Sequence, residues 1–212
     1  MTARLLSSIA QVEAASWNAL VGNGQPFLRH EFLLAMEDSG CTVPRTGWTV
    51  RHLVIDDARG RPVGALPLYR KSHSRGEFVF DFSWANAYAQ HGIPYYPKLL
   101  SAVPFTPVRG PRLLVSPDAD VAATTQLLTR AAIDYVRSER LSSWHVLFPT
   151  EDVAQGLAAA ELILRRDCQF HWFNQGYDSF DAFLATFTAE KRKKAKRERR
   201  RVFEAGIEFD TL

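Results

Sequence analysis

A dense run of basic side chains near the C-terminus is the part of the sequence best suited to bind a charged partner. Residues 191–201 read KRKKAKRERRR and contain nine Lys or Arg and one acid, whereas the formal net charge of the whole chain is only +3. The rest of the chain is therefore net acidic, so a polyanion contact is expected in this run. We predict that the run binds tRNA, another nucleic acid or a phosphorylated lipid precursor. The side chains expected to contact the polyanion are Lys191, Arg192, Lys193, Lys196, Arg197 and Arg200.

The residues around this run also predict its conformation. Thr188 is a suitable N-cap, Glu190 suits the positive end of a helix dipole, and no Gly or Pro occurs before Gly206. Residues 189–204 are therefore predicted to form a helix. The alternative to polyanion binding is a solvated helix that packs through a narrow apolar seam. That seam would consist of Ala195, Val202 and Phe203.

A second candidate is the loop-rich stretch from residue 95 to residue 112, which combines aromatic residues, prolines and cations. Loops held on a rigid sheet are common positions for binding residues. We predict that the cations hold an anionic acceptor while a tyrosine stacks on it or hydrogen-bonds to it. The predicted acceptor-binding residues are Tyr95, Tyr96, Lys98, Thr106, Arg109 and Arg112. The alternative stays open that the prolines and aromatics fill the core while the cations face water.

Catalytic side chains cannot be assigned from the sequence. Glu77 and Asp81 could act as a general base for an attacking amine, but nothing in the sequence chooses among the carboxylates. The six histidines show no HExxH or other ligand spacing, so no metal site is expected. The sequence contains no GxSxG elbow, which argues against a serine hydrolase. Cys41 and Cys168 form no CxxC motif, and both are expected to be reduced and packed.

The periodicity of the apolar residues predicts the elements that must position these side chains. Helices are expected at residues 9–21, 29–39, 84–91, 122–137, 151–164, 180–187 and 189–204. Strands are expected at residues 50–56, 62–69, 77–82, 99–103, 112–115, 144–148, 169–174 and 207–212. Early strands followed by alternating strands and helices indicate a mixed α/β or α+β sheet.

The composition limits the classes of protein to which the chain can belong. Apolar residues make up 46% of the sequence, which is enough for a packed core and argues against global disorder. No apolar run approaches the roughly 18 residues of a membrane span, and the N-terminus is not a signal peptide. We therefore expect a soluble, cytoplasmic protein without a membrane span.

Three long stretches of the chain resemble one protein family. They are residues 64–88 (GALPLYRKSHSRGEFVFDFSWANAY), 92–114 (GIPYYPKLLSAVPFTPVRGPRLL) and 170–206 (FHWFNQGYDSFDAFLATFTAEKRKKAKRERRRVFEAG). These stretches resemble the FemAB-like peptidoglycan biosynthesis/recognition family, which sits in the acetyltransferase-like (GNAT) superfamily. The likeness runs from about Trp17 to the end of the chain.

A weaker likeness connects the chain to the Fem ligases, which add amino acids from aminoacyl-tRNA to peptidoglycan precursors. Residues 107–111 (PVRGP) resemble their arginine-glycine-proline turn. Residues 191–206 resemble the basic helix that leads into their second acetyltransferase-like domain. The resemblance implies a bacterial protein whose N-terminal half is present here. It implies an acetyltransferase-like (GNAT) N-terminal domain at residues 1–178, a mixed sheet flanked by helices, then a helical connector with a basic arm at 179–206, and the start of a second, missing domain at 207–212.

The resemblance also implies a function. It is that of an acyl or aminoacyl transferase acting on an amine acceptor, expected to be a peptidoglycan precursor, with acyl-CoA or aminoacyl-tRNA as the donor of the full protein. The alternative is a non-catalytic module that recognises peptidoglycan precursor or nucleic acid through its basic helix. In one respect the chain departs from acetyltransferases, because Pro111 lacks the N–H that a pyrophosphate-binding loop would supply. No cofactor is therefore expected in this chain, and the chain alone is expected to be incomplete without its second domain.

Overall fold

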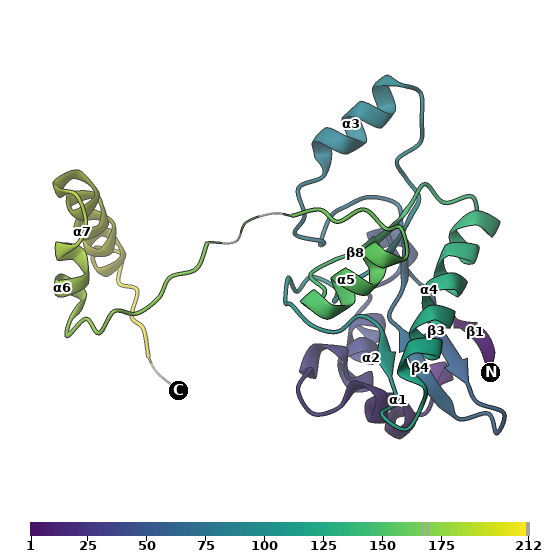
Figure 1. Cartoon of the computed structure of the whole chain (residues 1–212). Coiled ribbons are helices and arrows are strands. Elements are labelled where there is room, and N and C mark those ends of the chain that lie inside the picture. The colour runs from purple at the N-terminus through teal and green to yellow at the C-terminus, as the bar shows by residue number, and fades with distance from the viewer. Residues whose placement is uncertain (167, 169, 211–212) are drawn as a thin grey trace. The chain divides into compact units, whose positions relative to one another are not determined.

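The computed structural model describes residues 1–166, 168 and 170–210. The chain divides into two compact units, Met1–Leu164 and Arg165–Leu212. Unit 1 contains all the strands of the described residues, and unit 2 contains two helices (Figure 1). The domain boundaries expected at residues 178 and 206 stay a prediction.

Unit 1 is built around two small sheets that are joined where the chain runs from a strand of one sheet directly into a strand of the other. The first sheet has the order β1 (Thr2–Leu6), β3 (His52–Asp56), β4 (Pro62–Leu66) and β7 (Leu114–Val115). The second has the order β2 (Trp48–Val50), β5 (Tyr69–Lys71), β6 (Lys98–Ser101) and β8 (Trp144–Val146). Only Arg51 separates β2 from β3, and its N–H donates to the Leu68 carbonyl between β4 and β5 at 2.9 Å. The two sheets therefore continue into one another through a bent hairpin.

The strand directions show a mixed sheet. The pair of β6 and β8 is parallel, with Leu99 opposite Trp144, and the other pairs are antiparallel. This arrangement confirms the mixed α/β class expected from the sequence.

Helices cover both faces of the first sheet. On β3, Val54 faces a core that includes Trp17 and Leu33, whereas its neighbours Leu53 and Ile55 face a second core that includes Leu128. Successive strand residues point to opposite faces, so a strand buried on both sides must be apolar throughout. The first core lies under α1 (Ala14–Val21) and α2 (His30–Asp38), and the second lies under α4 (Val121–Ser138) and α5 (Glu151–Ala159).

Close packing of α4 on β4 depends on a glycine. A Cβ added at Gly64 would lie 2.5 Å from Thr124 Cγ2 and 3.3 Å from Leu128 Cδ1. The absence of a side chain therefore lets the helix approach the strand closely.

One helix of unit 1 contributes nothing to the core. Helix α3 (Phe82–Gln90) has no buried residue, and Figure 1 shows it at the margin of the unit, joined by two extended stretches. Short 3₁₀ helices complete the unit at Ile9–Gln11, Pro26–Leu28 and Pro44–Thr46.

Unit 2 consists of α6 (Phe180–Ala185) and α7 (Ala189–Glu204). The predicted basic helix at residues 189–204 is confirmed with the same bounds, and the Thr188 hydroxyl accepts from the Lys191 N–H at its start. Arg192 ties the two helices together by donating to three carbonyls near the end of α6. They are those of Leu184 at 3.1 Å, Ala185 at 3.1 Å and Phe187 at 3.0 Å.

Several predicted strands are wrong. Residues 77–82 form no strand, and the described residues 170–174 and 207–210 form none either. Gln169, Thr211 and Leu212, which the last two predictions also included, lie outside the described residues. Strand β1 was not predicted at all, although it pairs with β3 over five residues.

Candidate functional site

Two buried lysines meet where β5 and β6 pair. Lys71 ends β5 and Lys98 begins β6, and the register places them directly opposite each other. Both side chains have 0% exposure. Charged lysines are almost never fully buried unless they are paired, so this position requires counter-charges.

The segment that follows β5 supplies those counter-charges. The Lys98 ammonium donates to Ser74 Oγ at 2.8 Å, Glu77 Oε2 at 2.9 Å and Asp81 Oδ2 at 2.7 Å. These three bonds use all three N–H donors of the ammonium. Lys98 therefore holds the whole segment from residue 74 to residue 81 against the sheet.

Tyrosines complete the hydrogen bonds around Asp81. The Tyr95 hydroxyl and the Ser74 hydroxyl each donate to Asp81 Oδ2 at 2.8 Å. The Tyr96 hydroxyl lies 2.8 Å from Ser74 Oγ and must be the donor there, since the serine proton already goes to Asp81. We call these residues, with the two lysines and Glu77, the buried charge cluster.

Lys71 occupies a less polar part of the cluster. Its ammonium donates to the Arg75 carbonyl at 3.1 Å, lies 3.6 Å from the centroid of the Trp48 ring, and is 3.9 Å from Glu77 Oε1. Among the buried side-chain atoms, Glu77 Oε1 and Asp81 Oδ1 have no hydrogen-bond partner within the described residues. Each carboxylate therefore keeps one oxygen free to accept a proton or a donor.

The two acids of the cluster have opposite protonation behaviour. Burial raises the pKa of the Glu77 carboxyl, although Lys98 and Lys71 oppose this effect. Burial also lowers the pKa of Lys71 to about 7, against the attraction of Glu77. Asp81 is also desolvated, but the hydrogen bonds and charge of Lys98 outweigh that cost and lower its pKa. The pKa of Asp81 is therefore lowered, so its carboxyl favours the ionised form, whereas burial favours the neutral forms of both Lys71 and Glu77.

Backbone strain surrounds the cluster. Phe78 and Phe105 have φ values of 57° and 54°, which are uncommon for bulky residues. The Phe105 N–H donates to the Gly76 carbonyl at 3.2 Å, and its ring lies 5.3 Å from the Trp48 ring. The Phe105 side chain therefore packs on Trp48, whose ring also contacts the Lys71 ammonium, and it is 40% exposed.

The structure brings together three of the predicted acceptor-binding residues. Tyr95, Tyr96 and Lys98 all belong to the buried charge cluster, with Tyr96 half-buried. The Thr106 hydroxyl is outside it and donates to the Pro104 carbonyl at 3.1 Å.

The two predicted arginines lie elsewhere. Arg109 is exposed, donates to the Pro149 carbonyl and lies 3.8 Å from Glu151. Arg112 has 0% exposure, and burial lowers its pKa to about 10. Its guanidinium donates to three carbonyls and so fastens the loop at residues 108–111 to the end of β8. They are those of Leu147 at 2.9 Å, Pro111 at 3.0 Å and Val108 at 2.6 Å.

The same loop fills the space beside the parallel strands. The Gly110 N–H donates to the Phe148 carbonyl at 3.1 Å, which forms a parallel bridge beyond β8. At the start of α4, the Asp120 carboxylate accepts from the Ala123 N–H at 3.0 Å. The Gly110 and Ala123 donors, together with Arg112, therefore serve the fold itself.

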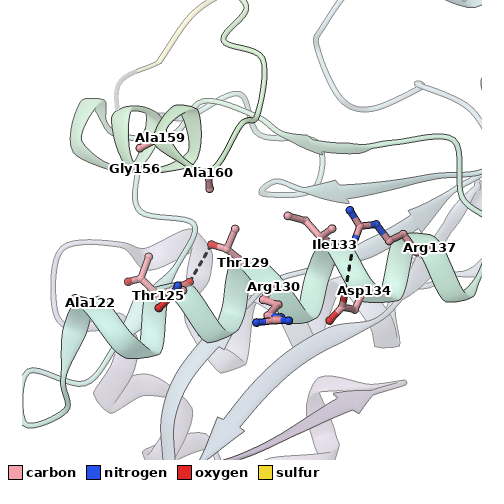
Figure 2. A pocket seen from close by; sticks show the side chains of 11 residues that line it. Ala122, Thr125, Thr129, Arg130, Ile133, Asp134, Arg137, Gly156, Ala159 and Ala160 are labelled. Atoms are coloured by element: carbon pink, nitrogen blue, oxygen red, sulfur yellow. Dashed lines mark hydrogen bonds and ion pairs between the residues drawn. The ribbon is translucent and has the colours of Figure 1, made fainter.

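A groove of about 520 Å³ lies between α4 and α5 in unit 1. Figure 2 shows α4 contributing polar side chains to it, while Gly156 and Ala159 of α5, with Ala160 directly after the helix, form the small-residue side. Arg137 and Asp134 lie 3.8 Å apart along its wall. Sequence reasoning missed this groove because its residues lie on the solvent faces of two ordinary amphipathic helices. The other residues lining it are Ala122, Thr125, Gln126, Thr129, Arg130 and Ile133.

The predicted polyanion-binding residues divide into two groups on α7. Arg192 fastens α6, Lys196 lies 3.0 Å from Asp181, and Arg200 lies 3.4 Å from Glu204. Lys191, Lys193 and Arg197 are exposed and form no ion pair within the described residues. These three side chains, joined by Arg201, are the cations best placed for a ligand.

Metal-binding clusters and membrane-crossing helices are not found among the described residues. In residues 1–166, 168 and 170–210, no group of three or more His, Cys, Asp or Glu residues could hold a metal ion. Over the same ranges, none of the helices combines the length and the apolar character needed to cross a bilayer.

Comparison with known proteins gives one match that covers nearly the whole chain. A family model described as FemAB-like, peptidoglycan biosynthesis/recognition, matches residues 8–212. No curated protein matches the chain.

Solved structures resemble the chain at low sequence identity. Two crystal structures of variants of the BH1408 protein from Bacillus halodurans are 10% and 9% identical, with TM-scores of 0.50 and 0.52; each covers 82% of this chain and 100% of its own. An acetyltransferase from Trypanosoma brucei is 13% identical with a TM-score of 0.47, covering 81% of this chain and 99% of its own.

Proposed function

Because the chain belongs to the FemAB-like family of peptidoglycan biosynthesis and recognition proteins, we propose that it is a transferase that attaches an acyl or aminoacyl group to an amine of a peptidoglycan precursor. The family assignment supports the precursor as the substrate class. The observation that supports transfer chemistry is the Lys71–Glu77 pair, whose pKa values are displaced toward each other in a water-poor setting.

The reaction requires a proton acceptor. The acceptor amine is an ammonium ion at neutral pH, so it must lose a proton before its lone pair can attack the acyl carbonyl carbon. That first proton passes to solvent. A new C–N bond then forms as the ester or thioester bond of the donor breaks, the attacking nitrogen releases a second proton, and the leaving oxygen or sulfur takes up a proton. Glu77, with a raised pKa and Oε1 unpaired, has the properties of a base that receives the second proton and passes it to the leaving group.

The geometry also assigns roles to the neighbouring residues. Lys98 fixes Glu77 through Oε2 and leaves Oε1 for the proton. Lys71 lies 3.9 Å from that oxygen and stabilises its ionised form. Because Glu77 is only 3% exposed, an acceptor reaches it only when the side chains around it move aside.

The basic helix α7 bears on the choice of donor. An aminoacyl-tRNA would engage the unpaired cations of α7, whereas acyl-CoA would need pyrophosphate donors. Residues 109–112 and the start of α4 already use the Gly110 and Ala123 N–H groups within the fold. These observations favour aminoacyl-tRNA as the donor.

A second candidate function is recognition of the precursor without turnover. It is favoured by the closure of the cluster, in which two lysines balance two carboxylates and all four side chains are at most 3% exposed. In that case the cluster would serve only to hold the loop at residues 72–81.

One assay separates the two functions. The chain is incubated with a nucleotide-linked muropeptide and either labelled aminoacyl-tRNA or labelled acyl-CoA, and transfer to the amine is measured by mass spectrometry. Glu77→Gln is expected to lower kcat by about 10²–10⁴-fold, the usual contribution of a general base. The matched control is Glu151→Gln, because that carboxylate is exposed and contacts Arg109 and Gln155 rather than the buried charge cluster.

The possible outcomes are distinct. Transfer that is lost in folded Glu77→Gln but kept in Glu151→Gln supports the transferase. Precursor binding without turnover in the wild type supports recognition, and unchanged turnover in Glu77→Gln removes the proposed base.

A further inference from the structure

The stretch around α3 carries an exposed aromatic surface. Phe78, Phe80, Phe82, Trp84 and Ile93 are 55%, 77%, 61%, 49% and 53% exposed. We call these five residues the α3 surface. These five large apolar side chains belong to one short stretch of the chain, and exposed apolar patches mark contact with another molecule or a membrane.

The buried charge cluster explains why these aromatics point outward. In residues 77–82 the sequence alternates, with Glu77 and Asp81 on one side and the phenylalanines on the other. Lys98 draws both carboxylates inward. Phe78, Phe80 and Phe82, which lie beside these carboxylates in the sequence, are left exposed to solvent.

The same arrangement removes every acid from the exposed surface of this stretch. Between residues 70 and 93 the only acidic residues are Glu77 and Asp81, which are 3% and 0% exposed. Arg70 and Arg75 are exposed cations in the same range. The solvent-facing part of residues 70–93 therefore exposes aromatic and cationic side chains and no acidic one.

Helix α3 itself has an unusual composition for a solvated helix. Its sequence, FSWANAYAQ, contains no charged residue, and none of its side chains is buried. Its packing within the unit includes an edge contact of Tyr88 with Tyr95, at 5.1 Å between ring centroids. A short helix without charges and without a buried face gains little from water or from the core.

We propose that the α3 surface binds the interface of a lipid bilayer with anionic headgroups. Aromatic side chains favour the boundary between headgroups and acyl chains, and Arg70 and Arg75 match the headgroup phosphates. The absence of exposed acids over residues 70–93 removes the repulsion that such a surface would otherwise impose. Saccharide recognition fits less well, because the three phenylalanines offer no hydrogen-bonding groups for hydroxyls. The proposal does not depend on the transferase activity.

The test must separate the α3 surface from the basic helix, which also attracts anionic lipid. Every protein therefore carries Lys193→Gln, Arg197→Gln and Arg201→Gln, which remove three of the four unpaired cations of α7 named above. Binding is measured by co-sedimentation with vesicles of phosphatidylcholine, with and without phosphatidylglycerol. The fluorescence of the tryptophans is followed with brominated lipids, which quench only rings that reach the acyl boundary.

The decisive variant is Phe80→Ser with Trp84→Ser. It is expected to lower partitioning onto phosphatidylglycerol vesicles by at least about tenfold, because two large apolar side chains leave the interface. Trp84→Phe is expected to keep binding and to lose the quenching. Phe203→Ser, at a residue 81% exposed on α7, is the matched control and should not alter binding. Since all these side chains are exposed, the thermal unfolding midpoint should stay unchanged.

Three results would overturn the proposal. The first is equal vesicle binding by the parent and the double variant. The second is quenching that persists in Trp84→Phe. The third is a parent protein that ignores vesicles and self-associates through these residues, seen as a smaller particle for the double variant in size-exclusion chromatography.

Discussion

Replacing Lys98 with Met tests whether this residue holds the fold or binds a ligand. The substitution keeps the length and apolar stem of the side chain but removes the ammonium that donates to Ser74, Glu77 and Asp81. Asp81 keeps its bonds from Tyr95 and Ser74. Glu77 retains only the more distant ammonium of Lys71, at 3.9 Å. In the variant, the buried carboxylate of Glu77 thus lacks the hydrogen bond and most of the positive charge that offset its burial.

The expected cost follows from the removal of that ammonium. Deleting one partner of a buried ion pair destabilises proteins by about 3–5 kcal/mol, because the remaining charge is left without its partner. Since a domain of this size is stable by about 5–15 kcal/mol, Lys98→Met should unfold at a much lower urea concentration. Lys193→Met removes an exposed cation without an ion pair and should stay within about 0.5 kcal/mol of the wild type.

Urea unfolding, followed by near-ultraviolet circular dichroism of the buried tryptophans, measures both variants. Adding Glu77→Gln to Lys98→Met removes the uncompensated charge, so the double variant should recover part of the stability, with a coupling of about 0.5–3 kcal/mol. A destabilisation below about 1 kcal/mol in Lys98→Met, together with weaker binding of the muropeptide, would refute the structural role. That result would restore Lys98 as a ligand-binding residue.

Two further predictions concern pH and salt. Burial lowers the pKa of His52 from 6.5 to about 3. As the pH falls below 6.5, the imidazole of the unfolded chain therefore gains a proton while that of the folded protein stays neutral. The contribution of His52 to the free energy of unfolding is complete above pH 6.5 and falls by up to about 5 kcal/mol as the pH falls toward 3. A His52→Asn variant measured by urea unfolding at several pH values should show a shallower decline, and an equally steep one would contradict the assignment. On α7, replacing Lys193, Arg197 and Arg201 with Gln should reduce the log–log salt slope of tRNA binding by about 0.7–0.9 for each phosphate that the helix no longer neutralises. The matched control is Arg192→Gln, because that guanidinium serves α6, and an unchanged slope in the triple variant would exclude the helix as the binding surface.

Local signals predicted the helices well. Helix α7 has the predicted bounds because its N-cap, its helix-forming residues and its terminal glycine all lie within the segment itself. The core strands β3 and β4 were also expected, since continuous apolar residues indicate burial on both faces. Strand β1 was missed because its residues, TARLL, show no clear alternation and depend on pairing with β3.

The site could be predicted only in part, because the burial of a charged residue depends on partners that are distant in sequence. Tyr95, Tyr96 and Lys98 were recognised as a group, but their common surroundings come from residues 17, 21 and 24 positions away from Lys98. A lysine beside apolar residues in the sequence is more often a surface residue than a buried one. Only the register that places Lys71 opposite Lys98 shows that both lie inside.

The same register explains why the pattern at residues 77–82 was misinterpreted. Alternation predicts a strand whose apolar side faces the core, which is correct when the core is apolar. Here the neighbouring core position holds two ammonium groups, so the carboxylates of Glu77 and Asp81 turn inward and the phenylalanines turn outward. Residues 77–82 are held through these carboxylates and do not pair with a neighbouring strand. The burial of the two carboxylates and the exposure of the phenylalanines beside them thus produce both the buried charge cluster and the exposed α3 surface.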